Sequence, residues 1–433
     1  MPTAKKPTGP PEVRMYNVGF GDCFLLSFPY TKANGGDRHL LIDFGSHPNP
    51  TGAPKGFMAA IANDVKARCQ GGKLAVVATH RHADHVSGFT TNGKGTASGD
   101  IIRALKPEVV VQPWTEHPDA AQDAHTAPAL RRAALGFHRS LAAMQDYAAA
   151  LVPALRDLPA YLPRDLRARL GFVGEDAVKN VAAVKNLMTM GARKARYVHA
   201  GTASGLETFL PGVAIHVLGP PTLAQESDIG SYAKKSDQYW LRRRQIALGG
   251  RPAGRARGAA RPLFPGAARR PKGRFPAHAR WFVARLRQAY GDEMLGIVTE
   301  LDDVLNNTSI ILLFEVAGQK LLFPGDAQLE NWTYALKQYR ALLKGVSVYK
   351  VGHHGSLNAT PKALWRIMTE GDTALPSAQF RTLMSTLRDV HGGKKGAPTE
   401  VPRVPLVDEL RQKSKLTTTL DHADFGKPTV VQL

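Results

Sequence analysis

The chain has few cysteines and lacks any long apolar run. Only Cys23 and Cys69 are cysteines among its 433 residues, so at most one disulfide can form and no Cys-x-x-Cys pair is present to bind zinc. No stretch approaches the roughly 18 uninterrupted apolar residues of a membrane span, and the N-terminal MPTAKKPTGPPE has no apolar stretch after its lysines. We therefore expect a cytoplasmic protein without a membrane partner, whose metal ligands, if any, are His and carboxylate side chains.

Acidic residues are scarce relative to basic ones. The chain has 36 Asp and Glu against 57 Lys and Arg, a net charge of +21. Residues 231–280 alone contain 14 Lys or Arg and one acid, Asp237, and such a segment attracts polyanions. The hydrophobic fraction of 43% and the charged fraction of 21% are typical of a globular protein.

Short apolar runs bounded by turn residues predict a strand-rich protein. A helix is expected near 55–70, and others at 328–343 and 361–370. Two further runs, YVHAGT (197–202) and VAIHVLG (213–219), are interpreted as a strand pair. The remaining predicted strands lie at 13–18, 23–28, 39–44, 73–79, 346–352, 379–385 and 428–433, with a hairpin at 309–327 that turns around Ala317-Gly318.

Two segments differ from this pattern. Residues 113–197 are rich in Ala, Leu and Arg at helical spacing, which predicts a helical insertion. Residues 232–280 are low in complexity and rich in Gly, Pro, Ala and Arg. Because such a segment buries too little apolar area to offset its chain entropy, it is expected to be a flexible basic insertion. Residues 12–433 are interpreted as one domain that contains both insertions.

The first chemical motif is THRHADH (79–85), directly after an apolar run. In extended backbone, residues two apart point to the same side, so His80 and His82 can converge on one ion. Asp84 and His85 then turn toward a second position. Imidazole suits Zn, Fe, Mn or Ni, and a carboxylate widens the choice to harder ions. Four candidate ligands at one strand end indicate a metal site rather than a His-rich surface loop.

Two later motifs also follow apolar runs. FPGD (323–326) presents Asp326, and VGHHGS (351–356) presents His353 and His354. Glycines beside paired histidines let the backbone approach an ion closely. Taken singly, the first is an ordinary turn, and the second is equally compatible with a structural role.

Together and in this order, the three motifs resemble the metallo-β-lactamase superfamily, and more narrowly its competence-type (ComEC-like) branch of DNA-uptake hydrolases. NVGFGDC (17–23), LIDFG (41–45) and NTS (307–309) carry the same resemblance. It implies an α/β fold, an αββα four-layer sandwich with metals at the strand ends on one edge. The implied cofactor is a divalent metal, two ions of Zn, with Mn or Fe as alternatives. The implied ligands are His80 and His82 for one ion, Asp84, His85 and either His353 or His354 for the other, and Asp326 between them.

Three more residues have expected roles near these ligands. The resemblance implies that Asp43 lies behind them, as a buried carboxylate that orients a ligand. Many members of the superfamily supply another mid-chain histidine to the first ion, and His199 is the candidate here, although an isolated histidine at a strand end is usually structural. Water or the Asn307 amide would otherwise complete that site, so the number of ions stays open.

The motifs predict a metal-dependent hydrolase in which a metal-bound hydroxide attacks phosphorus or an acyl carbon. Asp84 and His354 are the candidate catalytic residues: Asp84 orients the hydroxide, and one histidine of the 353/354 pair stabilises charge or protonates the leaving group. A bridging Asp326 resembles phosphodiesterase and RNA-processing members, which favours a phosphodiesterase or nuclease. The alternatives are hydrolysis of a lactone, thioester or phosphocholine ester, or a nucleic-acid-binding or defence-system component with a structural metal site.

The basic insertion suggests a partner. Its Lys and Arg provide sequence-independent affinity for phosphates, and interleaved aromatic residues can stack on bases. The competing interpretation is a solvated insertion without a ligand. The candidate contacts to a nucleic acid or nucleotide are Arg242, Arg243, Arg244, Arg255 and Arg257.

Overall fold

The computed structural model describes most of the chain outside the two predicted insertions. The described residues are 6–117, 180–222, 225–226, 305–390 and 400–433, except for the single residues 194, 357, 359 and 423. The basic insertion predicted for 232–280, with its five candidate arginines, lies outside the described residues. So does most of the predicted helical insertion, residues 118–179.

The first of two mixed sheets is formed mainly by the N-terminal part of the chain. Strands β3 to β6 run parallel, whereas β13, β1, β2 and β3 pair antiparallel. Strands β3 and β4 are buried along their whole length except Lys73, and both contain runs of aliphatic residues, as expected of strands covered on both faces. Within the described residues the sheet has seven strands, in the order β13 (Pro428–Gln432), β1 (Glu12–Tyr16), β2 (Cys23–Phe28), β3 (Arg38–Phe44), β4 (Lys73–Val77), β5 (Val110–Pro113) and β6 (Arg196–Val198).

The second sheet is formed mainly by the C-terminal part. Strands β9 to β12 run parallel, and β7, β8 and β9 pair antiparallel. The hairpin predicted around Ala317-Gly318 is present, with φ of 49° and 76° at these two residues, the left-handed backbone that a two-residue hairpin turn requires. The six strands of this sheet in the described residues are, in order, β12 (Lys415–Thr418), β11 (Arg381–Met384), β10 (Val348–Lys350), β9 (Gln319–Phe323), β8 (Ile311–Val316) and β7 (Ala214–Gly219).

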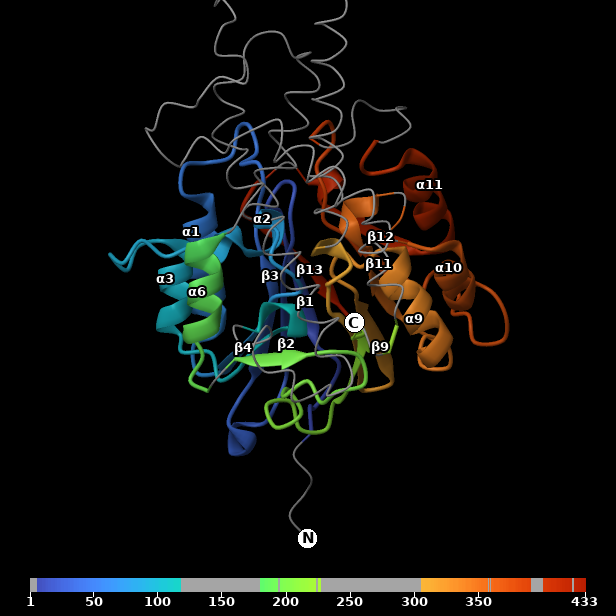
Figure 1. Cartoon of the computed structure of the whole chain (residues 1–433), viewed down its shortest axis with the longest axis horizontal. Helices are drawn as coiled ribbons and strands as arrows, with labels where there is room; N and C mark the ends of the chain where they lie inside the picture. The colour runs from blue at the N-terminus through green and yellow to red at the C-terminus, as the bar shows by residue number, and fades with distance from the viewer. Residues whose placement is uncertain are drawn as a thin grey trace, which may run out of the picture.

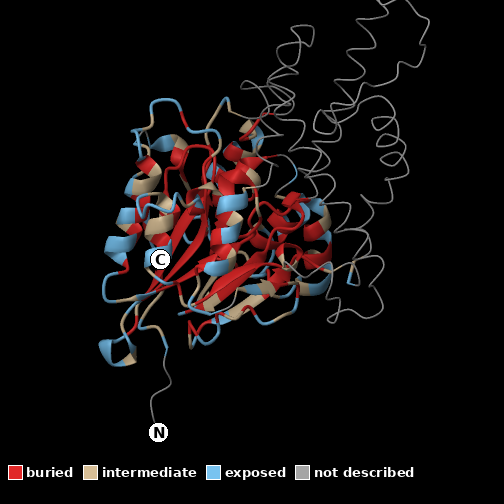
Figure 2. Cartoon of the chain, turned by 60° about the vertical axis from the view of Figure 1, so that its left-hand side comes forward, coloured by how far each residue is buried: buried red, intermediate tan, exposed pale blue. Residues whose placement is uncertain are grey.

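The two sheets pack face to face through an apolar core. Aromatic rings from both sheets meet there: Phe24 lies 5.7 Å from Phe323, and Phe28 lies 6.4 Å from Phe314, between ring centroids. Leu, Ile and Val side chains of both sheets fill the rest of this layer. Figure 2 shows the strands as buried elements in the middle of the molecule. Burial of the facing surfaces therefore fixes one sheet against the other.

Helices cover the outer face of each sheet (Figure 1). Side chains of α1 (Phe57–Arg68), α3 (Ser98–Ala104) and α6 (Val181–Thr189) pack in one cluster with the first sheet. A separate cluster joins α9 (Leu329–Tyr339), α10 (Lys362–Thr369) and α11 (Val404–Lys413) to the second sheet. The chain is thus an α/β sandwich with two sheets between two layers of helices.

In the described ranges no helix combines the length and the apolar character that crossing a bilayer requires. Several helical elements are only about one turn long. The short elements are the helix α2 (Ala83–Val86) and the 3₁₀ turns η1 (Lys32–Asn34), η2 (Ser87–Phe89), η3 (Trp114–Glu116), η7 (His353–Gly355) and η8 (Thr419–Asp421).

The structure differs from the sequence-based expectation at the edges of the helical insertion. Residues 196–198 and 214–219 do not form a strand pair: β6 adds to the first sheet beside β5, and β7 to the second beside β8. Both ends of the segment 113–197 also belong to the sandwich. Pro113 is the last residue of β5, α6 packs on the first sheet, and β6 extends that sheet. The reason is that apolar patterning identifies a strand without identifying its neighbour.

Candidate metal centre

Strand ends of both sheets carry the candidate ligands to one place. His80 and His82 follow β4, Asp326 follows β9, and His354 follows β10. These are carboxyl ends of parallel strands in the two sheets. The loops after such strands are where open α/β sheets bind ligands. The three motifs thus converge, although they lie far apart in the sequence.

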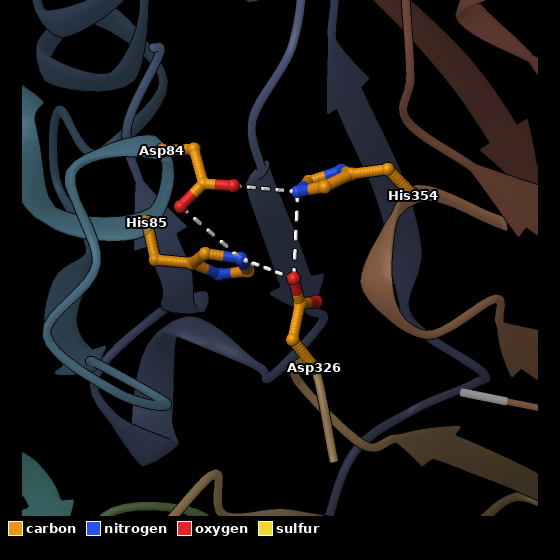
Figure 3. A group of neighbouring side chains, drawn as sticks. All are labelled: Asp84, His85, Asp326 and His354. Atoms are coloured by element: carbon orange, nitrogen blue, oxygen red, sulfur yellow. Dashed lines mark hydrogen bonds and ion pairs between the residues drawn. The ribbon is translucent and has the colours of Figure 1, made fainter. Parts of the chain in front are cut away.

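The first group of ligands consists of Asp84, His85, Asp326 and His354 (Figure 3). All four residues are buried, and one ligand atom of each lies within 4.8 Å of the others. His354 Nε2 is 2.9 Å from Asp84 Oδ2 and 3.4 Å from Asp326 Oδ2. His85 Nε2 is 2.9 Å from Asp326 Oδ2. Two imidazoles and two carboxylates therefore surround a common point.

A second group of three adjoins the first. His80, His82 and Asp84 also offer ligand atoms within 4.8 Å of one another. The ring centroids of His80 and His82 are 4.7 Å apart, and those of His80 and His85 are 4.2 Å apart. Asp84 belongs to both groups, whereas the family resemblance implies Asp326 as the shared carboxylate.

The other predicted residues lie outside these groups. His353 donates its backbone N–H to Asp326 Oδ1 at 3.0 Å, and its ring belongs to neither group. The Nδ1 atom of His199 lies 3.0 Å from the carbonyl of Ala200. The Asn307 amide donates to Glu330 Oε2 at 2.8 Å. Of the histidine pair, His354 is the one that the structure brings to the ligands.

Asp43 lies behind the ligands, as expected of an orienting carboxylate. Its Oδ2 atom is 2.8 Å from Nδ1 of His85. Thr79 donates to it twice, from its backbone N–H to Oδ1 and from its hydroxyl to Oδ2, each at 2.7 Å. Such partners fix the ring orientation of a ligating histidine. Asp43 and Asp22 form a third buried acidic group with His85.

The histidine hydrogen bonds favour a cation between the ligands. The ring Nδ1 of His354 lies 2.9 Å from the carbonyl of Ser385, which can only accept, so this nitrogen carries hydrogen. In a neutral ring, Nε2 then presents a lone pair to the carboxylates of Asp84 and Asp326, which also present lone pairs. The same holds for His85, whose Nδ1 meets Asp43. A proton or a metal ion resolves this arrangement.

The pKa values show the same need for positive charge. Burial lowers the pKa of His354, but the carboxylates of Asp326, Asp22 and Asp84 outweigh it and raise the pKa to about 9. Burial likewise lowers the pKa of His85, and the surrounding aspartates raise it well above its usual value. Without a metal, protons bind where the cation would otherwise be.

His80 is in the form that binds metals. Burial, followed by the nearby rings of His85 and His82, lowers its pKa well below the usual value, so its imidazole is neutral. Among the described residues, its Nε2 atom and Oδ1 of Asp84 are buried and make no hydrogen bond. Buried polar atoms are normally paired, and a divalent cation would satisfy both. The donor set, imidazoles and carboxylates without thiols, suits Zn, Mn or Fe.

Two glycines let other loops support the ligand loop at close range. A Cβ atom on Gly45 would lie 2.3 Å from the carbonyl carbon of Asp84, and one on Gly21 would lie 2.7 Å from the carbonyl oxygen of Asp84. The Asp22 N–H also donates to the Asp84 carbonyl at 2.9 Å. The motifs at 17–23 and 41–45 therefore hold the backbone that carries Asp84 and His85.

Two further glycines serve the later motifs. Gly325 has φ of 56°, and a Cβ atom there would lie 2.7 Å from Cβ of Thr79. Gly355 has φ of 83°, and its Cβ atom would meet Pro402 at 2.9 Å. Both positions combine left-handed backbone with close contact, which only glycine tolerates.

Residues not identified from the sequence complete the surroundings. Lys350 and Asp22 form a buried ion pair beneath the ligands. Arg81, between the two histidines of the first motif, pairs with Glu116: its Nε lies 2.8 Å from both carboxylate oxygens. The only sequence signal for Lys350 is a charged residue inside the apolar run VSVYKVG.

No protein-family model matches the chain, and no curated protein matches it. The class of site therefore rests on the structure: an α/β sandwich whose described residues gather buried His and Asp side chains that could hold a metal ion.

Proposed function

We propose that the protein is a metal-dependent hydrolase related to the metallo-β-lactamase superfamily, and that it cleaves phosphodiesters. The observation that carries the proposal is the convergence of Asp84, His85, Asp326 and His354 from three loops on one buried point. The layers of helices and sheets agree with the αββα sandwich that the sequence motifs imply.

The two ligand groups give two adjoining positions for divalent ions. His80, His82 and Asp84 would hold one ion, and Asp84, His85, Asp326 and His354 the other. Divalent ions supply Lewis acidity, which polarises an ester and favours ionisation of water near neutral pH.

The chain's own residues organise this chemistry. Asp84 contacts His354 through Oδ2, while Oδ1 makes no hydrogen bond in the described residues and is available to a cation. Because its carboxylate adjoins both cation positions, Asp84 would orient the nucleophile. His354 acts in this arrangement as a ligand. His353, the half-buried neighbour of His354, is the histidine to which we assign stabilisation of charge on a leaving group.

A carboxylate at position 326 favours phosphodiesters. A harder oxygen ligand widens the choice of ion toward Mn, and two-metal sites commonly act on phosphate esters. Burial alone would raise the pKa of Asp326, but His85, Lys350 and His354 hold it well below the usual value, so the carboxylate is ionised.

Hydrolysis of bis-p-nitrophenyl phosphate by the full chain, with Zn²⁺ or Mn²⁺ added, tests this function. Asp326→Asn should lower kcat/KM by more than about 100-fold, beyond the 10–100-fold typical of residues behind the ligands. Asp421→Asn, on the surface, is the matched control and should retain the wild-type rate.

A p-nitrophenyl acetate and a lactone assay run in parallel distinguish the ester classes. Faster hydrolysis of either than of the phosphodiester would refute the substrate class. No hydrolysis of any of them, or full activity in Asp326→Asn, would refute the proposed enzyme.

A further inference from the structure

Lys350, at the end of β10, is a fully enclosed cation beneath the candidate metal centre. Its side chain is 2% exposed, and lysine is almost never buried unless it is paired. Its ammonium group contacts Asp22 Oδ2. It also donates to Asp326 Oδ1 and to the carbonyl of Gly325, each at 3.1 Å. Three acceptors match the three N–H groups of an ammonium ion.

These contacts separate the roles of the two oxygens of Asp326. Oδ1 accepts from Lys350 Nζ at 3.1 Å and from the His353 N–H at 3.0 Å. Oδ2 faces the other way, 2.9 Å from His85 Nε2 and 3.4 Å from His354 Nε2. Lys350 therefore fixes the carboxylate so that one oxygen is presented to the ligand group.

Asp22, the partner of Lys350, lies behind both histidines of that group. Its Oδ2 atom is 3.7 Å from His85 Nδ1, and its Oδ1 atom is 3.7 Å from His354 Nδ1. Its backbone N–H donates to the Asp84 carbonyl at 2.9 Å. The Asp22–Lys350 pair thus touches or adjoins every member of the first ligand group.

Charge also distinguishes this pair from an ordinary buried ion pair. Among the described residues, Lys350 is the one ammonium group at the centre. Four buried aspartates surround the centre: Asp22, Asp43, Asp84 and Asp326. With neutral imidazoles, three negative charges remain uncompensated, which suits one or two divalent cations. A pair retained only for stability would gain little, because desolvation offsets most of its attraction.

We propose that Asp22 and Lys350 are positioning residues that set the geometry and affinity of the cation position formed by Asp84, His85, Asp326 and His354. The inference rests on the proposed metal-dependent function. Lys350 orients Asp326. Asp22 holds Lys350 in place, donates its backbone N–H to the Asp84 carbonyl, and places negative charge 3.7 Å behind the Nδ1 atoms of both histidines. Neither residue contacts the substrate in this role.

Co²⁺ is the probe that tests this proposal, because its visible absorption reports ligand geometry. Titration of the metal-free full chain gives the dissociation constant and the spectrum of bound Co²⁺. Asp22→Asn and Lys350→Met should each bind Co²⁺ about 10–100-fold more weakly, with a shifted spectrum. Asp424→Asn and Lys427→Met alter an exposed pair of the same composition and should match the wild type.

Asp22→Asn keeps the side-chain shape and leaves Lys350 with Asp326 and Gly325 as partners. It therefore remains informative if Lys350→Met does not fold, which circular dichroism establishes. Wild-type affinity and an unchanged spectrum in folded Asp22→Asn would overturn the positioning role but leave the metal centre intact. If the wild-type chain binds no Co²⁺, both the positioning role and the proposed metal-dependent function are refuted.

Discussion

Asp43 Oδ2 lies 2.8 Å from His85 Nδ1, and the backbone of Asp43 has φ of 55°. Left-handed backbone at a non-glycine residue costs free energy and persists only where the surroundings fix it. Here Thr79 fixes the carboxylate with two hydrogen bonds of 2.7 Å. The strained backbone of Asp43 at the end of β3 thus places its carboxylate where it fixes the orientation of His85.

Asp43→Asn should lower metal affinity and hydrolytic activity by about 10–100-fold. Asparagine has the same shape and tolerates left-handed backbone, so the fold should persist. The amide lacks the negative charge that holds the Nδ1 hydrogen of His85, and one of its acceptor positions is replaced by N–H. Metal titration and kcat/KM measure the effect, with Asp421→Asn as the control. Unchanged affinity would show that Asp43 does not orient the ligand.

Gly45→Ala should destabilise the protein by about 1–3 kcal/mol or more. The new methyl group would lie 2.3 Å from the Asp84 carbonyl carbon and 2.4 Å from the His85 backbone nitrogen, so the ligand loop must move. We expect a lower urea midpoint together with weaker metal binding. The matched substitution is Gly9→Ala, where no atom lies within 4 Å of the added group. Equal effects of the two substitutions would contradict the close support of this loop.

The metal-free protein should lose stability as the pH rises through about 9. His354 has a pKa raised to about 9 from the ordinary 6.5. The proton therefore stabilises the fold fully below pH 6.5, and this contribution, roughly 3 kcal/mol, disappears as the pH rises through the folded-state pKa. A bound metal replaces the proton, so the loaded protein should not show the loss.

Urea unfolding between pH 6 and 10, with and without chelator, measures this difference. His216→Gln serves as the control, because His216 pairs with Glu315 away from the centre. A chelated protein equally stable at pH 7 and pH 10 would contradict the expected linkage, as would an identical loss in the metal-loaded protein.

Local sequence patterns predict most of the strands. The run SIILLFEVAGQKLLF indicates a hairpin because apolar stretches flank Ala317-Gly318, and β8 and β9 form it. The helix α11 is not predicted, since its buried side chains are only Val407 and Leu410, too narrow an apolar stripe to stand out. Neighbouring strands in a sheet are not predicted either, as β6 and β7 show. The period of an apolar pattern indicates which face of a strand is buried, and not which strand lies beside it.

The ligands are predictable where a motif is contiguous. His80, His82 and Asp84 stand together after one strand, so spacing alone indicates convergence. The Asp22–Lys350 pair joins a loop to the end of a strand far away in the sequence, and neither residue has a local pattern that identifies its partner. A lysine within an apolar strand does indicate a buried counter-ion, which is the one signal that the sequence offers.

Asp84 belongs to both ligand groups, whereas His80 lies in one and His354 in the other. Loss of its carboxylate would remove a donor from each ion at once, so the phenotype of an Asp84 variant cannot be attributed to either. Mutational dissection of the two cation positions must therefore use the histidines, one position at a time. Any redesign that alters metal preference at one position through Asp84 will alter the other as well.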